Sequence, residues 1–291
     1  MCVGQNACMD TRRIPEGQQR WIVQQAMAGQ DPDTVLRPLL EAGWPEQEAI
    51  DAVQAVVARH LEEDARRSGV PLPVPVPVPI QPNGPALLDA GDRQVQLLAS
   101  LMLPRVVVLG GLLSDDECDA LVELARPRLR RSTIVDGLTG GDQVHADRTS
   151  RGMFFARGAD PLCARIEARI ARLLEWPVEN GEGLQVLNYP PGAQYRPHYD
   201  YFDPAGPGTG VLLEQGGQRV ATVVMYLNTP ERGGATTFPD AHLEVAAVKG
   251  NAVFFSYDRP HPMTRTLHGG APVLAGQKWI ATKWLRERAH G

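Results

Sequence analysis

Apolar residues recur at helical spacing in the first quarter of the chain. Glycine and proline residues divide positions 16–67 into three segments, with Gly29 and Gly43 ending the first two and Pro45 opening the third. In the third segment apolar residues repeat every three or four positions: Ala49, Ile50, Val53, Val56, Val57 and Leu61. Because such a face must be buried, residues 1–70 are predicted to form a small module of three short helices.

Proline occupies every second position in residues 71–79. Proline lacks an N–H and fixes φ, which excludes a helix or a central strand. The segment therefore predicts a polyproline II linker over 71–85, of which the alternating stretch 71–79 would span about 30 Å at roughly 3.1 Å per residue. It would separate the helical module from a second domain that spans 86–291.

The second domain is predicted to combine two helices with many short strands. Ser114 and Glu117 form a capping box for a helix through Ala125, and Asp160 can cap a helix through Glu175. The predicted strands are Leu184–Tyr189, Arg219–Asn228, Ala235–Phe238, Asn251–Tyr257, Thr264–His268 and Lys278–Arg286. This pattern predicts an α+β fold, with a β-sandwich or barrel and helices packed outside it.

Charge and composition exclude several classes of protein. The 291 residues carry a formal net charge of −5, so no basic excess favours a nucleic-acid partner. No apolar run approaches the roughly 20 residues of a membrane helix, and the amino terminus lacks the apolar core of a secretory signal. The four cysteines form no C-x-x-C pair. We therefore expect a cytoplasmic protein with reduced thiols.

One pair of side chains suggests a metal site. His198 and Asp200 are two residues apart, so an extended backbone points both to one face. A further imidazole would complete the facial triad typical of non-haem iron(II) oxygenases. Alone, the pair is more often a hydrogen-bonded or surface pair. Of the four histidines that follow, only His268 lies in a strand-like segment that a turn joins to another strand, which begins at Lys278.

Lys278 is one of only three lysines. A hairpin with its turn at residues 269–277 would bring Lys278 beside His268 on one inner face. A buried ammonium next to a metal requires an anion, and 2-oxoglutarate can supply one: its keto acid chelates iron while its far carboxylate pairs with the lysine. The alternative is a solvated lysine on an edge strand.

Residues 184–286 resemble the catalytic core of the prolyl 4-hydroxylases of bacterial type, within the iron(II)- and 2-oxoglutarate-dependent dioxygenase superfamily. Weaker similarity reaches back to residues 148–150. The matching blocks, in chain order, are Tyr189 with Gly192, Tyr195–Phe202, Arg219–Asn228, Gly233–Pro239, Lys249–Ala252 and Leu267–Trp284.

The resemblance implies a double-stranded β-helix, or jelly roll, around an iron site. Iron would be held by His198, Asp200 and His268, and the far carboxylate of 2-oxoglutarate by Lys278. Tyr189 and Thr236 fall at further cosubstrate contacts, with plain interior residues as the alternative. Ascorbate is a further small molecule that the family implies.

The resemblance also implies contacts to a peptide substrate. Tyr195, Arg219 and Trp284 fall at such positions, while Arg148 and Ser150 lie on a segment that closes over the substrate in relatives. The glycine-rich loop 136–142 is a candidate lid, with an ordinary surface loop as the alternative. The stretch 203–218 is longer than the connection requires, which leaves substrate preference open.

The leading hypothesis is an enzyme that hydroxylates a proline residue in a peptide or cytoplasmic protein and releases succinate and CO2. One alternative is a hydroxylase of a free amino acid or other small molecule on the same scaffold. Another is a binding protein whose helical module recruits a partner while the barrel is not catalytic.

Overall fold

The chain forms two compact units, residues 1–72 and residues 73–291. The computed structural model describes residues 13–78, 84–131, 134–135, 142–143 and 150–291. Within this part of the chain no helix is long and apolar enough to cross a membrane. Most of the expected lid, residues 136–141, and Arg148 lie outside the described residues.

The first unit contains the three predicted helices, α1 (Glu16–Met27), α2 (Pro32–Glu41) and α3 (Glu46–Ser68). The side chain of Asp31 caps α2 by accepting a hydrogen bond from the amide of Asp33. All three helices contribute to a core of their own: Ile14, Ile22, Val35, Leu39, Ala49 and Val56. The three-helix module is confirmed, although α3, with 23 residues, is longer than the short helix expected.

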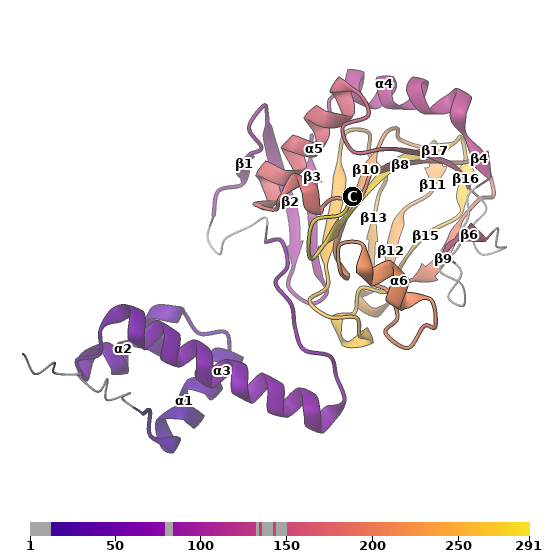
Figure 1. The fold of residues 1–291 in the computed structure, drawn as a ribbon. Coiled ribbons are helices and arrows are strands. Elements are labelled where there is room, and N and C mark those ends of the chain that lie inside the picture. The colour runs from indigo at the N-terminus through magenta and orange to yellow at the C-terminus, as the bar shows by residue number, and fades with distance from the viewer. Residues whose placement is uncertain (1–12, 79–83, 132–133, 136–141, 144–149) are drawn as a thin grey trace, which may run out of the picture. The chain divides into compact units, whose positions relative to one another are not determined.

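The second unit is built on a nine-stranded antiparallel sheet (Figure 1). Its strands are, in spatial order, β1 (Leu87–Asp89), β2 (Gln94–Leu101), β3 (Arg105–Gly110), β14 (Ala252–Ser256), β10 (Arg219–Tyr226), β17 (Lys278–Arg286), β8 (Leu184–Tyr189), β7 (Arg151–Phe155) and β4 (Arg130–Arg131).

A four-stranded sheet contributes the other wall of the barrel, in the order β13 (Leu243–Val245), β12 (Thr236–Phe238), β15 (His268–Gly270) and β9 (Tyr195–His198). Two short pairs complete the strands, β11 (Arg232–Gly233) with β16 (Val273–Ala275) and β5 (Ile134–Val135) with β6 (Asp142–Gln143). Side chains from both walls, among them Tyr226, Phe255 and Ile280 of the large sheet and Phe238 and Val245 of the small one, form one apolar cluster. The predicted α+β jelly roll is confirmed.

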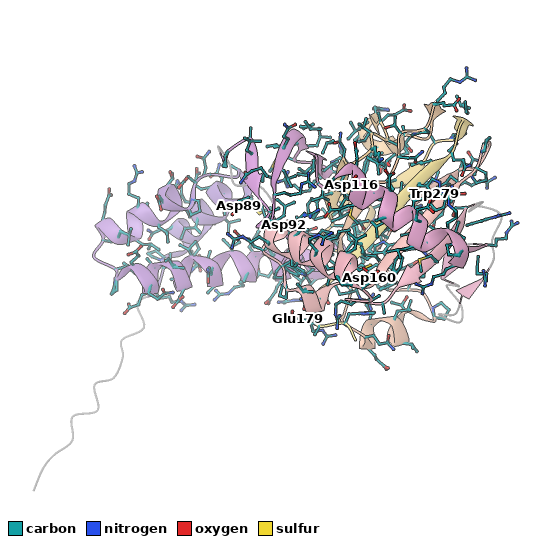
Figure 2. The ribbon with its side chains drawn as sticks, turned by 90° about the horizontal axis from the view of Figure 1, so that it is seen from above. Asp89, Asp92, Asp116, Asp160, Glu179 and Trp279 are labelled. Atoms are coloured by element: carbon teal, nitrogen blue, oxygen red, sulfur yellow. The ribbon has the colours of Figure 1, made fainter. Side chains whose placement is uncertain are left out.

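Helices α4 (Asp115–Ala125) and α5 (Pro161–Leu174) cover the other face of the large sheet. Seen from above, they lie across the strands, with Asp116 in the first turn of α4 and Asp160 at the start of α5 (Figure 2). The predicted capping box at Ser114 is present. The remaining helical segments are short: α6 (Thr209–Glu214) and 3-10 turns at Arg126–Arg128, Val178–Asn180, Pro239–Ala241 and Pro262–Thr264.

The predicted strand Thr264–His268 and the hairpin built on it are wrong. Pro262–Thr264 is a 3-10 turn, which the side chain of His261 caps, and Arg265 ends the turn with φ at 53°. Strand β15 starts only at His268 and pairs with β9 and β12, whereas β17 pairs with β8 and β10. His268 and Lys278 therefore lie on different sheets.

Candidate metal centre and cosubstrate pocket

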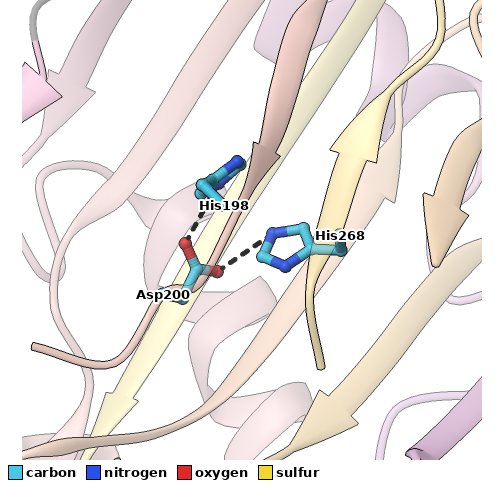
Figure 3. Close-up of side chains that lie close together, drawn as sticks. All are labelled: His198, Asp200 and His268. Atoms are coloured by element: carbon cyan, nitrogen blue, oxygen red, sulfur yellow. Dashed lines mark ion pairs between the residues drawn. The ribbon is translucent and has the colours of Figure 1, made fainter. Parts of the chain in front are cut away.

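Three ligand side chains meet between β9 and β15. His198 ends β9, His268 begins β15, and the two are register partners. Asp200 follows β9 and lies between the two imidazoles, 3.5 Å from Nε2 of each (Figure 3). One ligand atom from each residue lies within 4.8 Å of the other two. The predicted triad is therefore present.

Each histidine is oriented by its own backbone. Nδ1 of His198 lies 2.9 Å from the carbonyl of Arg196, and Nδ1 of His268 lies 3.0 Å from the carbonyl of Thr266. Because a carbonyl only accepts, Nδ1 carries a proton, and Nε2 is the nitrogen left for a metal. Nε2 of both imidazoles therefore faces Asp200.

The electrostatics of the triad favour a cation. Burial lowers the pKa of His268 to about 4, against the opposing charge of Asp200, so its imidazole is neutral at neutral pH. Burial opposes ionisation of Asp200, yet the neighbouring imidazoles hold the pKa of that carboxyl well below its usual range. Two imidazoles and one carboxylate fit a non-haem iron(II) ion.

A pocket joins the triad to Lys278. Successive side chains of strand β17 point to opposite faces of the sheet. Those on one face line this pocket: Lys278, Ile280, Thr282 and Trp284. Lys278 is 3% exposed, and among the described residues no carboxylate pairs with it. Burial lowers the pKa of its ammonium to about 8. Lys278 thus faces the pocket as a buried cation, with no anion supplied by the part of the chain that the structure describes.

Aromatic rings surround the lysine end of the pocket. The ammonium lies 5.7 Å from the ring centre of Tyr189 and 5.8 Å from that of Tyr226. The hydroxyl of Tyr226 donates to Thr236 Oγ1 at 2.8 Å. The structure therefore brings Tyr189, Thr236 and Lys278 together in the pocket, and their contacts to 2-oxoglutarate stay predictions.

The predicted substrate residues are not equally placed. Tyr195 stacks on His198 with ring centres 3.8 Å apart, and Trp284 lines the pocket. The Trp284 indole N–H is buried without a hydrogen-bond partner among the described residues. Ser150 is fully buried. Substrate contact by Tyr195, Trp284 and Ser150 stays a prediction.

Arg219 is engaged within the protein. Its guanidinium donates to Glu182 at 2.7 and 2.8 Å and lies 4.1 Å from the ring centre of Trp284 and 4.9 Å from that of Phe202. The same carboxylate lies 3.3 Å from Arg286 Nη1. The structure thus shows Arg219 as a support behind Trp284, and a direct substrate contact stays a prediction.

Several residues of this region escaped the sequence analysis. Glu182 compensates two buried guanidinium groups, and Arg286 donates to the carbonyls of Leu212 and Gln215, which fixes α6 against the barrel. No sequence signal marks Glu182 as their partner. Thr222, by contrast, lies in one of the matching blocks, and its hydroxyl donates to Asp200 Oδ2.

Comparisons with known proteins identify relatives of this chain. Residues 184–286 match the family model described as the 2OG-Fe(II) oxygenase superfamily. Prolyl 4-hydroxylase 5 of Arabidopsis thaliana is 41% identical over 216 residues, which cover 67% of this chain and 72% of the relative. Prolyl 4-hydroxylase 1 of Arabidopsis thaliana is 43% identical over 204 residues, covering 64% and 70%. The crystal structure of the viral collagen prolyl hydroxylase from Paramecium Bursaria Chlorella virus-1 with 2OG is 30% identical, covering 62% and 95%, with a TM-score of 0.48.

The jelly roll and its histidine–aspartate–histidine site define an iron(II)- and 2-oxoglutarate-dependent dioxygenase. Within that superfamily, the chain belongs to the prolyl 4-hydroxylase family. These plant relatives do not bear on the narrower expectation of a bacterial type, which stays a prediction, as does ascorbate binding.

Proposed function

We propose that this enzyme hydroxylates a proline residue within a peptide or protein, with 2-oxoglutarate as cosubstrate and succinate and CO2 as products. The observation that carries the proposal is that one pocket is lined both by the triad and by a buried lysine that pairs with no carboxylate of the described residues. A 2-oxo dicarboxylate fits these two ends, because one end can chelate a metal and the other is an anion. Membership of the prolyl 4-hydroxylase family supports the choice of proline.

Different side chains of the pocket would bind the metal and the cosubstrate. His198, Asp200 and His268 would hold iron(II), and Lys278 would bind the far carboxylate of the cosubstrate. Bound iron and 2-oxoglutarate supply an oxidant for an unactivated C–H bond. The side chains of Leu187, Val224 and Ile280 give the pocket an apolar wall, which would limit the access of water to the reacting atoms.

The unpaired indole of Trp284 supports a peptide substrate. A buried N–H without an acceptor is unfavourable, and the carbonyl of a bound peptide would satisfy it. Trp284 lines the same pocket as the triad, so a chain bound to it would pass close to the metal. This placement supplies a donor for a substrate carbonyl close to the metal.

The test is succinate formation from 2-oxoglutarate with iron(II) and O2, with and without short proline-containing peptides, and with His198→Ala as the blank. Stimulation by a peptide that gains the mass of one oxygen atom would support the proposal. Slow turnover that requires His198 but ignores every peptide would favour a small-molecule hydroxylase. No turnover at all would favour a binding protein with a non-catalytic barrel.

A further inference from the structure

The carboxylate of Asp200 is held from the opposite sheet. Thr222 on β10 donates a 2.7 Å hydrogen bond to Asp200 Oδ2, and the hydroxyl of Tyr257 lies 3.0 Å from Thr222 Oγ1. Both supporting residues are buried, with Thr222 0% and Tyr257 2% exposed. The amide of Tyr257 in turn donates to the carbonyl of Val220 at 2.9 Å, which fixes Tyr257 beside the strand of Thr222.

The direction of each hydrogen bond follows from counting protons. Thr222 Oγ1 is the donor to Asp200 Oδ2, so the single hydroxyl proton of Thr222 points to this carboxyl oxygen. The contact between the two hydroxyls must then use the proton of Tyr257. Burial and the charge of Asp200 raise the pKa of Tyr257 well above its usual value, so this proton is retained. The result is an ordered chain of donors from Tyr257 through Thr222 to Asp200.

Asp200 is held in a different way from the two histidine ligands. Each imidazole is oriented by a carbonyl two residues back in the chain. Asp200 instead depends on a side chain from the large sheet, so its orientation depends on how the two sheets face each other. The other charged group near Asp200 is Arg219, which is already engaged by Glu182.

We propose that Thr222 and Tyr257 are positioning residues that fix the Asp200 carboxylate for the metal. With Oδ2 engaged by Thr222, rotation of the carboxylate is restricted and the ligand is preorganised before the ion binds. The inference rests on the metal site of the proposed dioxygenase and not on the identity of its substrate. It is therefore tested by metal binding alone.

The experiment titrates the full-length protein with cobalt(II) under anaerobic conditions and follows the visible absorption of the bound ion. Removal of an outer partner of a metal ligand typically weakens binding about 10- to 100-fold, which is the rise in dissociation constant expected for Thr222→Val. Thr222→Ser keeps the hydroxyl and is expected to bind like the parent. Tyr257→Phe leaves the Thr222 donor in place and should have a smaller effect, at most about tenfold.

A double variant separates positioning from general packing. Because Tyr257 acts through Thr222, adding Tyr257→Phe to Thr222→Val should weaken cobalt binding no further. The matched control is Thr209→Val, which removes another buried hydroxyl, one that donates to the carbonyl of Asp203 at 2.5 Å in the α6 segment. It is expected to lower the melting temperature without changing cobalt affinity or spectrum.

The inference is overturned if Thr222→Val folds and binds cobalt with unchanged affinity and spectrum. If that variant does not fold, Thr222→Ser and Tyr257→Phe decide: equal affinity in both would overturn the inference, and a loss confined to Tyr257→Phe would support it. Failure of the parent to bind cobalt more tightly than His198→Ala would instead refute the metal site itself.

Discussion

Two buried lysines on strand β17 occupy opposite faces of the same sheet. Lys278 and Lys283 are five residues apart, an odd number, so their side chains point in opposite directions. They are similarly inaccessible, at 3% and 2% exposure. Lys283 lies 2.5 Å from Glu167 of α5, whereas Lys278 faces the pocket with no carboxylate among the described residues. The two lysines therefore do not differ in solvent accessibility. They differ in whether a carboxylate pairs with the ammonium.

The difference separates a structural cation from one that awaits a ligand. An ion pair between α5 and β17 satisfies both buried groups within the protein. A buried ammonium without an anion is unfavourable, and burial lowers the pKa of Lys278 to about 8 as a result. The remaining lysine, Lys249, pairs with Asp119 at the surface. Of the three lysines, Lys278, which shares a pocket with the triad, is the one that pairs with no carboxylate of the described residues.

The largest effect on stability is expected from Glu167→Gln. This change leaves the Lys283 ammonium buried without its counter-charge, and breaking a buried pair in this way costs about 3–5 kcal/mol of unfolding free energy. Glutamine keeps an acceptor for the amide of Gly158, which now donates to Glu167 Oε2. Urea denaturation measures the loss. A control that replaces both partners with methionine should recover most of it, and an unchanged midpoint for Glu167→Gln would contradict the comparison.

The opposite result is expected for Lys278→Met. Removal of an unpaired buried charge should leave the unfolding free energy unchanged or raise it. Binding of 2-oxoglutarate should weaken by at least ~30-fold, because loss of one partner of a buried charge pair costs about 2 kcal/mol or more. Calorimetric titration of the metal-loaded enzyme measures the affinity. A loss of stability as large as that of Glu167→Gln would show that Lys278 is a structural cation.

The sequence allowed features to be predicted that depend on neighbouring residues, but not contacts between residues far apart in the chain. Short stretches of chain are enough to show the two-residue spacing of His198 and Asp200 and the capping residue Ser114. Lys278 stands out because the chain has only three lysines. The partner of Lys283 is Glu167, 116 positions away, and no local pattern connects them. Such pairs depend on how helices and sheets pack.

The hairpin between His268 and Lys278 shows the same limit. The predicted hairpin placed both residues on one inner face, and both do line one pocket. The predicted strand pairing is wrong, because the two strands belong to different sheets that face each other. Chain order favoured pairing of neighbours, whereas the jelly roll pairs β15 with β9 and β12.

The charge of Lys278 makes cosubstrate binding depend on pH in one direction. Below a pKa of about 8 the ammonium is protonated in the ligand-free protein, and above it the proton is lost. The carboxylates of 2-oxoglutarate stay ionised throughout, so its dissociation constant should rise about tenfold per pH unit above that pKa. The Lys278→Arg variant keeps its positive charge over this pH range. If this variant binds 2-oxoglutarate, its dissociation constant should not change with pH. A flat profile for the parent enzyme would exclude the ammonium as the anion's partner.

The smallest effect is expected from Tyr226→Phe, and it tests what surrounds the ammonium. The change removes the hydroxyl that donates to Thr236 but keeps the ring, whose centre lies 5.8 Å from Lys278 Nζ. Loss of one such hydrogen bond costs about 0.5–1.5 kcal/mol of unfolding free energy. Because the ring and the ammonium both remain, 2-oxoglutarate affinity should fall at most about tenfold, well short of the loss in Lys278→Met. An equal loss in the two variants would place the anion's main contact on the Tyr226–Thr236 hydroxyl pair, and the difference between the two buried lysines would then not explain cosubstrate binding.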